Sequence, residues 1–88
     1  MTSLYRLDVP TGRGRLIGAT GFPEVQAMSF APDGTLYGWD AYAGLVTIDP
    51  STGAATDVNP EIGGILNLSS ITFTPDGRLF GATYDLYA

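Results

Sequence analysis

Aromatic rings and carboxylates gather in the segments that we expect to connect strands, and their types suit ligand binding. The candidate ligand-binding residues are Phe22, Trp39, Asp40, Tyr42, Tyr84 and Asp85, with Tyr87 beside them. A ring supplies flat apolar area and a carboxylate accepts hydrogen bonds from hydroxyl groups, so this set suits a sugar, a peptide or another small molecule. The competing interpretation, which we favour, is that most of the rings pack between sheets or between chains.

The sequence offers little for catalysis, because it contains no histidine and no cysteine. The commonest general base is therefore missing, as are thiolate chemistry, disulfides and cysteine-bound zinc. Ser69 and Ser70 have no histidine to activate them, and no Asp-x-Asp-x-Asp spacing indicates a calcium loop. We predict a protein that is not an enzyme and has no cofactor or metal site. An enzymatic interpretation ranks third: paired carboxylates can hydrolyse glycosides, but the only two glutamates, Glu24 and Glu61, both lie in the variable connections.

Composition and charge narrow the range of partners. The chain has 88 residues, of which 44% are hydrophobic and 15% charged, and its net charge is −5. A surplus of acidic groups disfavours binding to nucleic acid or to anionic membranes. No apolar run approaches the length of a membrane span, so we expect a soluble protein, while the absence of cysteine leaves its compartment open.

A nine-residue pattern occurs twice and indicates a repeat. Residues 30–38 read Phe-Ala-Pro-Asp-Gly-Thr-Leu-Tyr-Gly, and residues 73–81, which lie 43 positions later, read Phe-Thr-Pro-Asp-Gly-Arg-Leu-Phe-Gly. Proline presets φ for a tight turn, aspartate hydrogen-bonds the following backbone, and glycine accepts a positive φ. The predicted structural turn residues are Pro32, Asp33, Gly34, Pro75, Asp76 and Gly77. Each pattern is therefore predicted to be a β-hairpin.

A second repeat has a period of 41 residues, because Leu-Tyr-Arg-Leu-Asp at 4–8 matches Leu-Val-Thr-Ile-Asp at 45–49, and each is followed by a turn that ends in Thr-Gly. A weaker strand follows each turn, and its low amphipathicity suits a sheet edge. No segment shows helical periodicity. The expected strands are residues 4–8, 13–18, 27–30, 35–39, 45–49, 54–58, 70–73 and 78–82. Repeats of 40–45 residues built from short strands are typical of β-propeller blades.

The Phe-x-Pro-Asp-Gly-x-Leu-Tyr/Phe-Gly hairpin, followed by a strand ending in Ile-Asp and a Pro-Ser-Thr-Gly turn, resembles the blades of bacterial β-propellers of the NHL, YVTN and quinoprotein-like group. The resemblance covers nearly the whole chain. It implies that the strand before the Pro-Asp-Gly turn lies innermost, that the next two strands follow outward and that the weak strand lies at the rim. The residues of these motifs form turns, so the motifs carry almost no information about which ligand the protein binds.

Mapped onto such blades, the chain is a single unit of residues 1–88 with two incomplete ends. Residues 4–18 supply the third and fourth strands of one blade, residues 27–58 form a complete blade, and residues 69–83 supply the first and second strands of another. We predict an all-β propeller with two four-stranded blades per chain, closed into a six-bladed ring by homotrimerisation. An eight-bladed homotetramer is the alternative. Trimers of two-blade chains are known among small bacterial and fungal lectins.

The function expected from this assembly is that of a non-enzymatic oligomeric scaffold or binding module, as a fragment or designed derivative of a longer propeller. The alternative is a lectin-like carbohydrate-binding protein with sites between blades. The predicted partners are further copies of the chain and a small-molecule, glycan or peptide ligand.

Overall fold

The computed structural model describes residues 1–64 and 67–83, and all regular structure within these ranges is β-strand. The strands are β1 (Ser3–Leu7), β2 (Gly14–Ala19), β3 (Val25–Phe30), β4 (Leu36–Asp40), β5 (Gly44–Ile48), β6 (Ala55–Asp57), β7 (Leu68–Phe73) and β8 (Leu79–Thr83). The predicted all-β class is therefore confirmed, and each predicted strand lies within about two residues of an observed one. The described ranges contain no helix that could cross a membrane.

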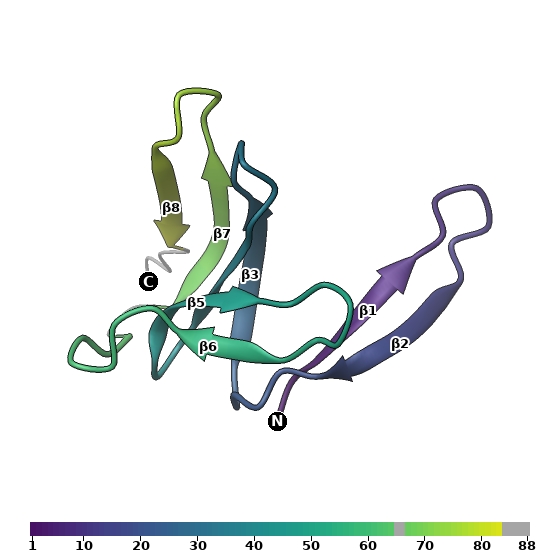
Figure 1. Ribbon diagram of the computed structural model, residues 1–88, viewed down its shortest axis with the longest axis horizontal. Helices are drawn as coiled ribbons and strands as arrows, with labels where there is room; N and C mark the ends of the chain where they lie inside the picture. The colour runs from purple at the N-terminus through teal and green to yellow at the C-terminus, as the bar shows by residue number, and fades with distance from the viewer. Residues whose placement is uncertain (65–66, 84–88) are drawn as a thin grey trace, which may run out of the picture.

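The described strands form three antiparallel sheets. A central four-stranded sheet has the order β3-β4-β5-β6, and each of the other two sheets is a single hairpin, β1-β2 or β7-β8. Figure 1 shows the β1-β2 hairpin on one side of β3 and the β7-β8 hairpin on the other. The first and last hairpins therefore do not pair with each other.

The turns of the central sheet follow from local chemistry. The amide of Gly34 donates to the carbonyl of Ala31 at 2.9 Å, which closes a tight turn with Pro32 and Asp33 at its centre. Gly34 has φ of 91°, a left-handed value that glycine adopts at no steric cost. A glycine with positive φ placed just after a tight turn is typical of three-residue hairpin loops.

One face of the central sheet, which we call the Val46 face, carries the main core. Leu36, Val46 and Ile48 are buried there, and Leu4 of β1 packs on them. Partly buried apolar residues surround this cluster, namely Ile17, Phe22, Val25, Ala43 and Ala55. One end of the β1-β2 hairpin, with Leu4 and Ile17, therefore packs on the Val46 face, while Tyr5, Leu7 and Leu16 of the same hairpin stay exposed.

The opposite face, which we call the Tyr37 face, is covered by β7. The rings of Tyr37 and Phe73 lie 5.3 Å apart between centroids, at an interplanar angle of 50°. The amide of Phe73 also donates to the Ser29 hydroxyl at 3.3 Å. On the central sheet, β7 contacts β3 and, to a smaller extent, β4. It does not contact β5 or β6, so it covers only part of the Tyr37 face.

The described residues bury few apolar side chains for a chain of this size. Those that are buried are Leu4, Leu36, Val46, Ile48 and Ile71. Many large apolar residues are exposed instead, namely Met1, Tyr5, Leu7, Val9, Leu16, Met28, Phe30, Tyr42, Val58, Ile62 and Phe80. Isolated exposed apolar residues are normal in soluble proteins, whereas contiguous patches mark interaction sites.

Candidate functional site

Asp40 ends β4 and, of the predicted site residues that the structure describes, is the most deeply buried, with no exposed surface. Its Oδ1 accepts a hydrogen bond from the Glu24 amide at 2.8 Å, and its Oδ2 accepts from the amides of Tyr42 at 3.0 Å and Ala43 at 2.8 Å. A buried carboxylate requires such compensation. Asp40 thus ties the β4-β5 loop to the segment that precedes β3, and both of its oxygens are occupied in doing so.

The remaining predicted residues do not converge on one place. Phe22 packs against the core on the Val46 face. Side chains of neighbouring strand residues point to opposite faces, so Trp39, which precedes Asp40, lies on the Tyr37 face. Tyr42 lies in the β4-β5 loop with 68% of its surface exposed. Tyr84 and Asp85, like Tyr87, lie outside the residues that the structure describes.

Of the predicted site residues that the structure describes, Trp39 lines a hollow that could hold a ligand. It measures about 190 Å³ and has mainly apolar walls. Its lining residues are Trp39, Gly44, Leu45, Val58, Asn59, Ile62 and Gly63. Leu45 stands directly opposite Trp39 in the β4-β5 register, and Val58 follows β6. We call this space the Trp39 hollow; it opens on the part of the Tyr37 face that β7 does not reach.

Trp39 was predicted as a site residue because it is aromatic, whereas the aliphatic residues Leu45, Val58 and Ile62 were not predicted. Leu45 could have been predicted from the register of the β4-β5 hairpin. A short loop between residues 40 and 44 places Trp39 opposite Leu45, and directly opposed residues share a face of the sheet.

A larger hollow, of about 500 Å³, lies along the β1-β2 hairpin. Arg6, Arg13 and Arg15 line it together with Asp8, and all four are exposed. Arg6 and Arg15 are directly opposite each other in the hairpin register, an arrangement of like charges that disfavours the pair. This end of the molecule is therefore basic within an acidic chain.

The turn aspartates act on the backbone. The Thr35 amide donates to Asp33 Oδ1 at 2.9 Å, and this bond holds the pKa of the Asp33 carboxyl below its ordinary value. At Asp49 the Ser51 hydroxyl donates at 2.7 Å and the Ser51 amide at 2.9 Å, and both lower the pKa of Asp49. Hydrogen bonds donated to the charged form favour that form.

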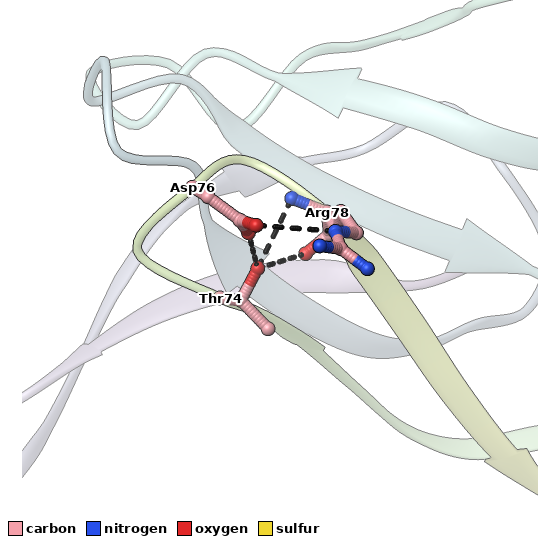
Figure 2. A network of polar contacts seen from close by, with 3 residues as sticks. All are labelled: Thr74, Asp76 and Arg78. Atoms are coloured by element: carbon pink, nitrogen blue, oxygen red, sulfur yellow. Dashed lines mark hydrogen bonds and ion pairs between the residues drawn. The ribbon is translucent and has the colours of Figure 1, made fainter.

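The second Pro-Asp-Gly turn uses the same chemistry with different partners (Figure 2). The Thr74 hydroxyl donates to Asp76 Oδ1, and this bond is the main cause that lowers the pKa of Asp76. The Arg78 Nε donates to the other carboxylate oxygen at 3.1 Å, while the Arg78 amide donates to the Thr74 hydroxyl at 3.2 Å. Thr74, Asp76 and Arg78 bond one another within a single turn. These bonds therefore stabilise the β7-β8 hairpin.

Within 1–64 and 67–83, no group of three or more histidine, cysteine, aspartate or glutamate side chains is placed to hold a metal ion. The geometry provides two features that could bind a partner: the Trp39 hollow, and the outer edges of β1 and β8, with which no other described strand pairs.

Comparison with known proteins gives no relative: no family model, no curated protein and no solved structure matches the chain.

Proposed function

We propose that the chain is a two-blade unit of a β-propeller and that its copies close into a ring that serves as a scaffold or binding module. Three copies would form six blades, and four would form eight. The observation that carries the proposal is the sheet order: one four-stranded sheet, β3-β4-β5-β6, is flanked by two hairpins, and among the described residues no strand pairs with the outer edge of β1 or of β8. Each hairpin corresponds to half of the complete sheet.

The correspondence extends to register. In the β3-β4 hairpin Phe30 faces Leu36, and Val25 faces Asp40 after an irregularity; in β7-β8, Phe73 faces Leu79, and Leu68 faces Thr83 after the same irregularity. All of these positions differ by 43 residues. The β7-β8 hairpin therefore reproduces the first two strands of the complete sheet.

The β1-β2 hairpin reproduces the last two strands in the same way. Tyr5 faces Leu16 and Leu7 faces Gly14, as Val46 faces Asp57 and Ile48 faces Ala55 at positions 41 residues later. Joined edge to edge, β7-β8 of one copy and β1-β2 of another would restore the order of the complete sheet. A closed ring would pair the β1 and β8 edges of every copy, whereas an association that does not close would leave one such edge open at each end and extend into fibres.

The molar mass in solution, measured by light scattering, tests the proposal. We expect the mass of three chains, with four as the alternative ring. A folded single chain would contradict the assembly. A monomer would instead fit a longer parent whose neighbouring blades supply the missing strands.

A lectin-like carbohydrate binder with sites between blades is the second candidate, and the Trp39 hollow favours it. Trp39 supplies an aromatic wall and Asn59 an amide that can bond hydroxyl groups. A glycan array with the intact chain and with Trp39→Ala tests this candidate. Binding that the substitution removes would support it, and an array without signal would eliminate it.

The proposal includes no catalysis. Assays for hydrolase and lactonase turnover, with and without divalent metal, are expected to give no activity above background. Turnover that increases with enzyme concentration would overturn this part.

A further inference from the structure

The contact between β7 and the central sheet is an interface that the repeat can reproduce between copies, and each of its residues has an equivalent elsewhere in the chain. Tyr37 corresponds to Phe80, and Phe73 corresponds to Phe30, at a spacing of 43 residues. Tyr37 and Phe73 contact each other. Phe80 and Phe30, by contrast, are 54% and 59% exposed.

We propose that a second copy docks on β8 in the register that β5 has on β4, which brings Phe30 of that copy against Phe80. This inference rests on the proposed ring and specifies its interface. The register follows from the observed pairs Leu36–Ile48, Tyr37–Thr47 and Asp40–Gly44. Their equivalents place Leu79 opposite Leu7 of the second copy, Phe80 opposite its Arg6, and Thr83 opposite its Ser3.

The polar contact of the observed interface also has a counterpart. The Phe73 amide donates to the Ser29 hydroxyl at 3.3 Å. The equivalent residues are Phe30 and Thr72, and Thr72 has the same kind of acceptor. The Phe30 amide of the second copy would therefore donate to the Thr72 hydroxyl. The hydroxyl is retained although the residue type changes.

The docked hairpin would also cover the part of the Tyr37 face that β7 leaves open. Leu4 is buried because it packs on Leu36, Val46 and Ile48. Leu45 is the equivalent of Leu4. The equivalent of Leu36 is Leu79 of the same chain, and the equivalents of Val46 and Ile48 are Tyr5 and Leu7 of the second copy. Tyr5 and Leu7 are 55% and 68% exposed in the isolated chain, so the same docking buries both ends of the contact.

The surroundings of two equivalent glycines show what is missing at β8. A Cβ added to Gly38 would meet Val25 of β3 and both Ile48 and Val46 of β5. For a Cβ added to Gly81, the three nearest atoms all belong to side chains of β7, namely Leu68 and Ile71. The absent neighbours are the equivalents of Ile48 and Val46, which are again Leu7 and Tyr5 of the second copy.

A disulfide tests the register, because the chain has no cysteine of its own. In the double variant Ser3→Cys/Thr83→Cys the two residues would be directly opposed between copies, with Cα atoms about 4.5–5.5 Å apart, within the range of a disulfide. Mild oxidation should link every chain of the ring, and a non-reducing gel should show the ladder up to the closed oligomer. The control Tyr5→Cys/Thr83→Cys is displaced by two residues, or about 7 Å along the strand, and should not link.

Light scattering of the unsubstituted chain separates the failure of this register from the failure of the ring. An oligomer in which the control pair links and the Ser3–Thr83 pair does not overturns the register and leaves the ring. An oligomer in which neither pair links overturns docking at β8. A monomer overturns the ring and this inference with it.

A substitution tests the aromatic contact independently of the cysteines. Phe80→Asp alters a side chain that is exposed in the single chain, so its effect on folding of one copy is small, whereas its effect on association should be about thirtyfold or more at each interface. Tyr42→Asp is the matched control, since Tyr42 is also exposed, and should leave the oligomer intact. Assembly that survives Phe80→Asp unchanged would contradict the Phe80–Phe30 contact.

Discussion

At the scale of single residues, Asp40 shows how a carboxylate chosen as a ligand candidate can be required by the fold. Three backbone amides donate to it, and none of its surface is exposed. Removing the carboxylate leaves three partly buried amides without this acceptor. Hydrogen bonds to charged groups are worth more than neutral ones, and orphaned buried donors add a desolvation cost.

We therefore expect Asp40→Ala to lower the free energy of unfolding by about 2–4 kcal/mol. Urea unfolding at one fixed protein concentration measures the change. Glu24→Ala is the matched control, because the Glu24 side chain is exposed and only its backbone amide contacts Asp40; it should shift stability by about 0.5 kcal/mol or less. Equal effects of the two substitutions would contradict the role given to Asp40.

The turn aspartates predict a dependence on acid. The pKa values of Asp33, Asp49 and Asp76 lie below their ordinary value of 3.8 in the folded chain. A carboxyl whose pKa is lower when folded contributes stability above its unfolded pKa, and this contribution disappears as pH falls through the folded pKa. We expect the melting temperature to decrease below about pH 4 for this reason.

The triple variant Asp33→Asn/Asp49→Asn/Asp76→Asn isolates that contribution. Asparagine keeps an acceptor for the turn but binds no proton in this range. Thermal unfolding between pH 7 and pH 2 should therefore decline less steeply for the variant than for the unsubstituted chain. Identical slopes would show that these turns do not contribute to acid sensitivity.

At the scale of elements, the approach of β2 to the β5-β6 turn determines how the first hairpin sits on the central sheet. A Cβ added to Gly18 would lie 2.0 Å from the backbone oxygen of Thr52. The neighbouring Thr20 carbonyl accepts a hydrogen bond from the Ala55 amide at 3.0 Å. The close contact is therefore part of the seam between the two sheets.

Gly18→Ala should force these backbones apart and destabilise the chain by about 1–3 kcal/mol. Gly14→Ala is the control on the same strand, because its Cβ would meet only ordinary contacts at 3.6 Å and beyond. Alanine already occupies the equivalent position, Ala55. Chemical denaturation of both variants checks the difference; a loss from Gly14→Ala as large as that from Gly18→Ala would argue against the seam.

At the scale of the whole molecule, the proposed ring would bury apolar side chains that are exposed in the single chain and would pair the outer edges of β1 and β8. If the ring forms, the stability of the chain depends on association. Burial of apolar area contributes about 25 cal/mol per Å², before the cost of association is subtracted. A protein that gains its core in this way unfolds at a temperature that rises with concentration. Scanning calorimetry over a hundredfold range of concentration should show this rise in the unsubstituted chain, and Phe80→Asp should reduce it.

The sequence alone was sufficient for the local structure. Pro32, Asp33 and Gly34 define their turn through interactions within a few residues, and the 43-residue repeat of Phe30 as Phe73 located the second hairpin. The all-β class and the approximate strand positions followed from this chemistry, since hairpins depend on neighbours that are close in sequence.

The tertiary structure decided which faces meet and which residues are buried. Sequence spacing grouped Phe22 with Trp39, but the sheet separates them onto opposite faces. The sequence also could not show that three amides donate to Asp40. Nor could it show that Leu4 is buried while Tyr5 and Leu7 of the same strand are exposed. These outcomes depend on how separate sheets pack, a relation between residues distant in sequence that no local pattern encodes.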